Sequence, residues 1–437
     1  MSSALFRAAI FHTPSNPFKQ DASRALQAFA DGGLVVRDGR VIACGEYETV
    51  RAANPGIDGT DWRGGFLLPG FVDAHVHYPQ VRIIGALGRS LLDWLDQVAL
   101  PEEARMADVA YAAAIARQFV EALASHGTTT ALVFGAHFSQ ATAALFDAAD
   151  SCGIRIASGL VLSNRSLLYE LHHTPRQAYE ESTELIRRYH GRGKLLYAVT
   201  PRFALSATES MLEVCQTLVR EHPGVRLQTH INESTGEVAE LTKLFPWARD
   251  YLAVYERYAL SGPRSVMAHN VHATDSELAR LAAAGTSIAH CPGSNAMLGS
   301  GLFPFRRHVA AGVKCALGTD VGGGVGFGML KEALQAYLMQ RLMPDGLPLD
   351  AGSLLYLCTR AGADALGLAE EIGDFSSGKA ADFVYVRPVE GGLLESVVRH
   401  ADSSEQVLAS LFTLGGADSV REVHVAGNCV YHAQRAQ

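Results

Sequence analysis

The sequence predicts a (β/α)₈ barrel that carries a small β-domain assembled from both ends of the chain. Apolar strand-like runs alternate with Ala- and Leu-rich helical stretches over residues 67–372, as in a barrel. Short β runs occur near both ends of the chain, and polar side chains follow several central strands. We expect residues 1–66 and 373–437 to form the β-domain and residues 67–372 the barrel, with an open doubly wound sheet as the alternative.

The first β runs lie at residues 5–11 and 33–45. The second, "GLVVRDGRVIACG", contains an Asp-Gly pair that is typical of a tight hairpin turn. The runs "GKAADFVYV" (378–386) and "VREVHVAGNCVYH" (420–432) have the same alternating pattern near the other end. This similarity predicts one β-domain built from both termini.

The central part offers eight candidate strands with helices between them, which favours the barrel. The candidate strands are residues 70–76, 128–134, 155–162, 195–201, 225–231, 265–270, 287–291 and 315–320. The candidate helices are residues 108–126, 139–152, 175–190, 208–222 and 275–285.

Composition narrows the classes of function. The 437 residues are long enough for a large barrel with a catalytic cleft. A formal net charge of −8 and a pI of about 6.1 disfavour a nucleic-acid groove, because phosphate binding needs clustered Lys and Arg. We therefore expect a small, neutral substrate and no nucleic-acid partner.

The spacing of the cysteines and the length of the apolar runs bear on the cellular compartment in which the protein is expected. The seven cysteines are widely spaced and include no CxxC pair, which suits a reducing environment. The sequence contains no secretory signal pattern and no apolar run of the roughly 20 residues that a membrane span needs. We expect a cytoplasmic protein with no membrane partner.

Polar residues at strand ends are the main functional signal. His75 and His77 follow the first barrel strand, and His230, His269 and Asp320 end later ones. A lone histidine there is more often structural, and we expect histidines without this context to be solvated or structural. Residues two apart on a strand point the same way, and the C-terminal ends of barrel strands face one mouth. The five residues together therefore predict a metal site.

Imidazole and carboxylate ligands suit zinc, with iron as the alternative. His75, His77, His230 and Asp320 are the predicted ligands, with a further position left for water. A bound ion lowers the pKa of water from about 15.7 to near 7, so hydroxide exists at neutral pH and Asp320 can accept its proton. His269 is predicted to orient the hydroxide, and a role as fifth ligand is the alternative.

Two further features lie near the predicted mouth. Glu233 in "QTHINES" follows His230 closely, and beside a metal hydroxide a carboxylate is a good proton shuttle. The segment "LLDWLDQVALPEE" (91–103) is predicted to cover the mouth with Leu92, Trp94 and Leu95. The plainer alternatives are a solvated carboxylate and a helix packed on the barrel rim.

The motifs and their order resemble those of the metal-dependent amidohydrolase superfamily. They are "PGFVDAHVH", "HINE", "MAHNVH", "HCPGSNAMLGSG", "LGTDVGGG", "YLCTRAGADALGL" and "IGDFSSGKAADFVYV". Within the superfamily, "HYPQ" (77–80), "GTTTALVFG" (127–135) and "TPRF" (200–203) are most similar to the guanine deaminase family.

The resemblance implies a (β/α)₈ barrel with a small β-sandwich built from both termini, one zinc ion per subunit and a homodimer. It also implies the four metal ligands above, with Glu233 and Asp320 moving protons. The family's purine contacts fall on Gln80, Arg202 and Phe203, with His230 and Glu233 completing the substrate site. No strand-end lysine of the kind that bridges two metals is present, so a mononuclear site is expected.

The reaction expected from this resemblance is hydrolysis of guanine to xanthine and ammonia. Hydroxide attacks C2, Glu233 protonates N3, and Asp320 passes the proton of the hydroxide to the departing amine. Arg202 can only donate and so suits O6, whereas Gln80 donates and accepts and suits the adjacent edge. The amine at position 6 of adenine would face a donor, and unpaired groups in a dry pocket cost about 1–3 kcal/mol.

Two alternatives remain at this stage. One is a deaminase or chlorohydrolase of the same superfamily that acts on another purine, a pyrimidine or a triazine. The other is a non-catalytic scaffold on the same fold, which the full set of metal ligands disfavours.

Overall fold

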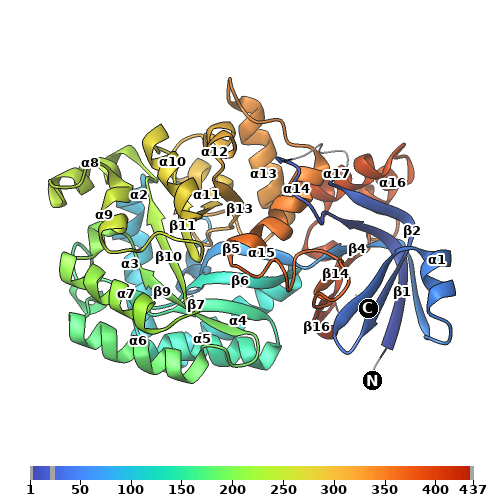
Figure 1. Cartoon of the computed structure of the whole chain (residues 1–437), viewed down its shortest axis with the longest axis horizontal. Coiled ribbons are helices and arrows are strands. Elements are labelled where there is room, and N and C mark those ends of the chain that lie inside the picture. Colours follow the sequence, from blue (N-terminus) through green and yellow to red (C-terminus); the bar gives the residue numbers. More distant parts are fainter. Residues whose placement is uncertain (1–2, 20–24, 434–437) are drawn as a thin grey trace.

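The computed structural model describes residues 3–19 and 25–433, which form a parallel barrel and a separate mixed sheet (Figure 1). The barrel strands follow the order β5, β6, β7, β9, β10, β11, β12 and β13. Their bounds are Phe71–His77, Thr128–Phe134, Arg155–Gly159, Leu195–Pro201, Arg226–Ile231, Ser265–His269, Ser287–His290 and Lys314–Leu317, and the short β8 (Val161–Leu162) pairs with β9. The predicted barrel is confirmed.

The end of the last strand closes onto the first strand. The amide of Asp320 donates to the carbonyl of His75 at 2.8 Å, and the amide of His77 donates to the carbonyl of Val321 at 3.1 Å. These bonds join the segment after β13 to β5. Asp320 is therefore held beside His75 by the backbone of the barrel itself.

Helices surround the barrel strands (Figure 1). The helix α4 begins after Asp108, whose carboxylate accepts from the amides of Ala110 and Tyr111 as an N-cap. The barrel helices are α4 (Val109–Ser125), α5 (Ser139–Cys152), α6 (Pro175–Tyr189), α7 (Glu209–Glu221), α8 (Thr235–Leu244), α9 (Tyr251–Arg257), α10 (Asp275–Ala284), α11 (Pro292–Met297), α12 (Phe305–Ala311), α13 (Met329–Leu342), α14 (Ala351–Cys358) and α15 (Arg360–Ala365).

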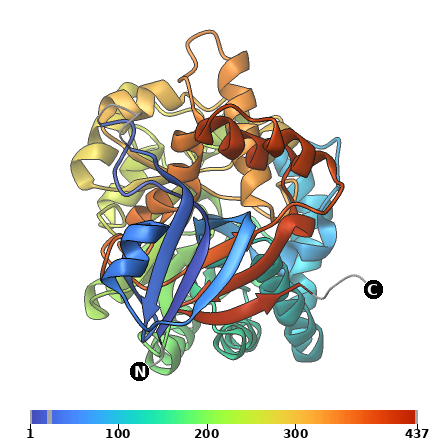
Figure 2. The same cartoon turned by 90° about the vertical axis from the view of Figure 1, so that its right-hand side faces the viewer.

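The second sheet is built from both ends of the chain, as predicted, with the blue N-terminal strands beside the red C-terminal strands in Figure 2. Its order is β16, β15, β14, β4, β1, β2, β3. The bounds are β1 (Ser3–His12), β2 (Gln27–Arg37), β3 (Arg40–Glu46), β4 (Gly59–Pro69), β14 (Phe383–Val386), β15 (Val420–Val425) and β16 (Asn428–His432), with α1 (Tyr47–Ala53) after β3. Since β4 pairs parallel with β1 and antiparallel with β14, it joins the two ends.

The predicted hairpin turn lies between β2 and β3. Asp38 and Gly39 have φ values of 49° and 77°, the left-handed conformations of a tight hairpin turn. Two C-terminal helices, α16 (Leu393–Arg399) and α17 (Ser404–Leu414), follow β14, and α17 packs against α13 and α14. The limits of the two domains, at residues 66 and 373, stay predictions.

No helix among residues 3–19 and 25–433 is long and apolar enough to cross a bilayer.

Candidate active site

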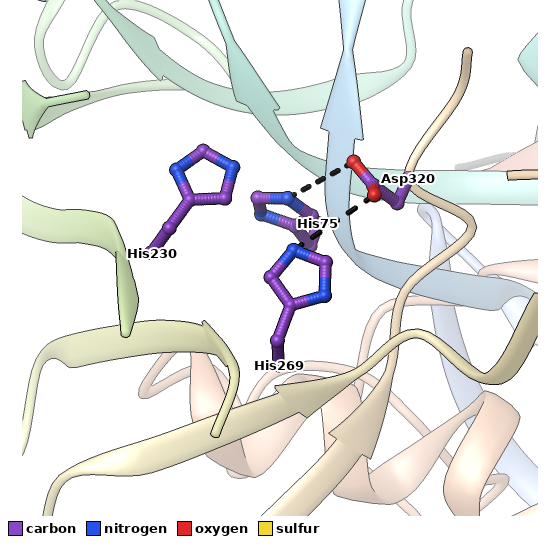
Figure 3. Close-up of side chains that lie close together, drawn as sticks. All are labelled: His75, His230, His269 and Asp320. Carbon is purple, nitrogen blue, oxygen red and sulfur yellow. Dashed lines mark ion pairs between the residues drawn. The ribbon is translucent and has the colours of Figure 1, made fainter. Parts of the chain in front are cut away.

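The polar residues predicted from the strand ends converge at the mouth of the barrel. His75 and His77 end β5, His230 lies near the end of β10, His269 ends β11, and Asp320 follows β13. All five side chains are buried. Figure 3 shows the imidazole rings of His75, His230 and His269, from three strands, grouped with the Asp320 carboxylate, which comes from the loop after β13.

The contacting atoms are close enough to share one ion. The Nε2 atom of His77 lies 3.2 Å from that of His75 and 3.2 Å from that of His230. Asp320 Oδ1 lies 3.2 Å from His75 Nε2 and 3.3 Å from His77 Nε2. Two nitrogens bonded to one tetrahedral zinc ion at about 2.0–2.1 Å lie roughly 3.3 Å apart. The predicted ligand set therefore fits a metal ion.

The outer contact of His230 prepares its ring for binding. Its Nδ1 atom lies 2.6 Å from the carbonyl oxygen of Arg202. This contact assigns the proton to Nδ1, which leaves the lone pair of Nε2 facing the other imidazoles.

Burial and pairing give the cluster the protonation states that metal ligands need. Burial lowers the pKa of His77 to about 4 and holds the pKa of His230 well below its ordinary value. Burial alone would raise the pKa of Asp320, but hydrogen bonds with His75 and His77 hold it well below its usual range. The cluster therefore combines neutral imidazoles with an ionised carboxylate.

His269 lies slightly farther from the Asp320 carboxylate than His75 and His77 do. Its Nε2 atom is 3.8 Å from Asp320 Oδ2 and 3.5 Å from Glu233 Oε2, and its Nδ1 atom faces Asn295 Oδ1 at 3.0 Å. The ligating atoms of His75, His230, His269 and Asp320 nevertheless all lie within 4.8 Å of one another. Geometry thus permits both the orienting role and the alternative role of fifth ligand.

The backbone at two of these residues is in the left-handed region. His269 has a φ of 72° and Asp320 a φ of 48°, conformations that cost energy for residues other than glycine. The surrounding barrel maintains them where side chains must turn toward the mouth.

Glu233 lies at the same pocket with a different electrostatic environment. Its Oε1 atom accepts a hydrogen bond from Ser300 Oγ at 3.3 Å, and its side chain is buried. Burial and the nearby carboxylates of Glu237 and Asp320 hold the pKa of Glu233 well above its ordinary value. The pKa of Glu233 is therefore shifted in the opposite direction to that of Asp320, the separation that acid–base chemistry requires.

The pocket at the mouth combines the polar cluster with an apolar wall. Its lining residues are His77, Gln80, Leu91, Trp94, Leu95, Arg202, Phe203, His230, Glu233, His269, Leu298 and Asp320. Every residue that was predicted to bind substrate lies in this lining.

The segment over the mouth lines the pocket with a different leucine from the one expected. The predicted segment, residues 91–103, forms α2 (Leu91–Trp94), a π-helical turn (Leu95–Ala99) and most of α3 (Leu100–Ala104), and a 3₁₀ turn (Tyr78–Ile83) precedes it. Leu91, Trp94 and Leu95 face the pocket, whereas Leu92 is 38% exposed and does not line it. The expectation for Leu92 is wrong because residues three and four apart share a helix face, so residue 91 accompanies 94 and 95.

The buried carboxylate of Glu103 bonds to both Gln80 and Arg202, the two polar residues predicted to bind the purine. The sequence alone did not predict this residue. Glu103 accepts from Gln80 Nε2 at 2.7 Å, and Arg202 Nη1 lies 2.8 and 2.7 Å from its two oxygens. Gln80 Oε1 in turn accepts from the amide of Gly322 at 3.0 Å. Both ends of the Gln80 amide are therefore fixed, and Arg202 is buried in an ion pair with Glu103.

Glu103 also reaches a histidine that was expected to be solvated or structural. His137 is buried, and its Nε2 atom lies 3.3 Å from Glu103 Oε2. Burial alone would raise the pKa of Glu103, but Arg202 and then His137 lower it below its ordinary range. An ionised Glu103 thus balances the charge of Arg202 and leaves this side of the pocket close to neutral.

Known protein families and proteins match this chain over nearly its whole length. The Amidohydrolase family model matches residues 66–430, and an Imidazolonepropionase-like composite domain of bacteria matches residues 32–56. A probable guanine deaminase of Deinococcus radiodurans is 54% identical over 433 residues, which are 98% of this chain and 98% of the relative. The guanine deaminase of Escherichia coli (strain K12) is 39% identical over 423 residues, 97% of this chain and 95% of the relative.

A solved structure shares the whole architecture. The structure of E. coli guanine deaminase has a TM-score of 0.93 to this chain at 36% sequence identity. The match covers 99% of this chain and 100% of that chain, so it includes both the barrel and the small sheet.

Proposed function

The chain belongs to the amidohydrolase family, and on this basis we propose that it hydrolyses guanine to xanthine and ammonia. The observation that carries the proposal is one buried pocket with two complementary ends. One end holds three imidazoles and two carboxylates whose pKa values are shifted in opposite directions, and the other holds an amide and a guanidinium that suit the edge of a purine.

His75, His77, His230 and Asp320 would hold one divalent ion per subunit, zinc by the preference of such ligands and iron as the alternative. Such an ion supplies a water molecule whose pKa is lowered toward neutrality.

Asp320 and Glu233 move the protons. Ionised Asp320 accepts one proton from the attacking water and delivers it to the amine that leaves C2. Protonated Glu233 donates to ring N3 as C2 is attacked, and the second proton of the water restores Glu233. The sum consumes one water, forms a C–O bond, breaks a C–N bond and releases ammonia.

His269 orients the attacking water. Its Nδ1 contact with Asn295 fixes the ring, and its Nε2 faces both Glu233 and Asp320. This position lies between the two groups that exchange protons with the water.

Gln80, Arg202 and Phe203 recognise the base. Arg202 uses Nη1 for Glu103 and keeps other N–H groups for O6 of guanine. The Gln80 amide has one N–H and one lone pair beyond its two protein bonds, which suits a purine edge that both donates and accepts. Phe203 lines the pocket beside them and packs against the ring.

A panel of bases tests the assignment. Purified zinc-loaded protein is incubated with guanine, adenine, cytosine and a chlorotriazine, and ammonia, chloride and the product spectrum are followed. We expect guanine to give xanthine and ammonia in equal amounts, with adenine turned over far more slowly. An unchanged guanine sample beside ammonia from another base would assign the chain to a different reaction of the family.

We also propose a homodimer in the cytoplasm. The dimer rests on the family resemblance, and the compartment is supported by seven cysteines that are all unpaired. Sedimentation at micromolar concentration tests the dimer, and a purely monomeric profile would contradict it.

A further inference from the structure

The hairpin of β15 and β16 carries a second group of metal-binding side chains, outside the barrel. One possible ligand atom from each of Glu422, His424 and Cys429 lies within 4.8 Å of the others. His432 Nε2 lies 3.8 Å from Glu422 Oε1 at the same place. Imidazole, thiolate and carboxylate are the three ligand types that zinc prefers.

The register of the hairpin places these four residues on one face. Glu422 pairs with His432 and His424 pairs with Cys429, with a shift in register between Val423 and His424. Side chains alternate along a strand, so residues 429 and 432 would face opposite sides of a regular one. The irregular register, typical of a β-bulge, places Cys429 opposite His424 and His432 opposite Glu422 on the same face of the hairpin.

His424 is held as a metal-binding histidine usually is. Its ring stacks on Phe383 with centroids 4.3 Å apart and planes at 12°. Its Nδ1 atom faces the carbonyl oxygen of Gly427 at 3.4 Å, and its Nε2 atom points toward Glu422 Oε2 at 2.9 Å. A backbone carbonyl at one ring nitrogen and a ligand cluster at the other are the outer contacts expected of a ligating imidazole.

We propose that this hairpin binds a second divalent ion of the zinc class through Glu422, His424 and Cys429, with solvent in the remaining coordination position. On binding, the thiol of Cys429 releases its proton to solvent and the thiolate takes its place on the ion. The ion would tie β16, the edge strand of the small sheet (Figure 1), to β15 and would play no part in guanine hydrolysis.

Cobalt distinguishes this site from the buried one. The cluster at the barrel mouth has no sulfur ligand, so a thiolate-to-cobalt charge-transfer band in the near ultraviolet can come only from a cysteine site. Metal-free full-length protein is titrated with Co²⁺ while absorbance and bound metal are measured. We expect two cobalt ions per chain, with the charge-transfer band growing during the second equivalent and disappearing when zinc is added.

Matched variants assign the band. Cys429→Ser should remove the band and one bound ion while guanine turnover is unchanged, and His424→Asn should weaken the second site by at least about tenfold. Cys152→Ser is the control, because Cys152 contacts the hairpin at the carbonyl of Val430 but lies outside the ligand group. The absence of the band in the unaltered protein, or its survival in Cys429→Ser, would overturn the proposal.

Discussion

Glu233 and Asp320 are two carboxylates in one pocket whose surroundings shift their pKa values in opposite directions. Burial and neighbouring carboxylates raise the pKa of Glu233, whereas the imidazoles beside Asp320 lower its pKa. The difference assigns the acid and the base without reference to position in the sequence.

Replacing Glu233 with glutamine tests the acid directly. The amide fills the same volume but cannot donate and recover a proton, so we expect kcat to fall by at least about 100-fold. Metal content should not change, because Glu233 is not among the ligands. The rate of xanthine formation gives kcat, and elemental analysis of the same sample gives the metal content. A fully active variant would remove Glu233 from the mechanism.

Replacing Glu103 with glutamine tests the group that positions the purine contacts. Arg202 would lose its buried counter-charge, so we expect KM for guanine to rise about tenfold or more, with a smaller change in kcat. The ratio of kcat/KM for guanine to kcat/KM for adenine should also fall.

The neighbouring residue provides a matched control for Glu103. Glu102 is buried as well, but its carboxylate faces Arg105 and Tyr111 instead of the pocket. Glu102→Gln should therefore leave KM nearly unchanged. Equal effects of the two substitutions would show that Glu103 acts only through general stability.

The sequence predicts a functional residue when its role follows from its position at the end of a strand. His75, His77, His230, His269 and Asp320 were predictable because every barrel strand ends at the same mouth. Glu103 was not, because "PEE" reads as the acidic first turn of a helix. Its function depends on Gln80 and Arg202, which lie far away in the sequence and approach it only in the folded chain.

The segment over the mouth is the element that closes the pocket. Leu91, Trp94 and Leu95 form one face of its helical turns and provide most of the apolar wall. The sequence predicted the segment but misplaced the first leucine, since it did not reveal which helix face meets the barrel.

Leu95→Ala tests whether this face binds substrate. Leu95 is only partly buried, so its truncation should lose about 0.8–1.4 kcal/mol of apolar contact with the base, which raises KM for guanine by about four- to tenfold. Leu92→Ala, on the exposed side of the same turn, should have little effect. Steady-state kinetics give KM for both variants. A larger rise in KM for Leu92→Ala than for Leu95→Ala would show that the other face of the helical turn meets the pocket.

At the scale of the whole molecule, the alternation of strands and helices predicted the barrel, and the paired β runs at both ends predicted the second sheet. The parallel pairing of β4 with β1 and the bonds from Asp320 and Val321 back to β5 were not predictable. They depend on register between distant segments, which local patterns do not specify.

The small sheet should make stability depend on pH through His12. This residue is buried at the end of β1 between Phe29 and Phe375, and burial lowers its pKa to about 4. Between pH 6.5 and 4 the unfolded chain binds a proton that the folded chain does not, so stability falls as pH falls, by up to about 3 kcal/mol.

Thermal unfolding of the unaltered protein and of His12→Gln at pH 7 and pH 5 measures this contribution. Glutamine can still accept from the amide of Phe375 but does not titrate. The variant should lose less stability between the two pH values. An identical loss in both proteins would show that other groups cause the acid sensitivity.

Guanine hydrolysis at the cluster of His75, His77, His230 and Asp320 should depend on a bound metal ion. The most direct measurement is the conversion of guanine to xanthine by metal-stripped protein as zinc is restored. We expect negligible turnover without metal and full recovery with the first equivalent of zinc, with no recovery in Asp320→Asn. Unchanged turnover by the metal-stripped protein would contradict this dependence on metal.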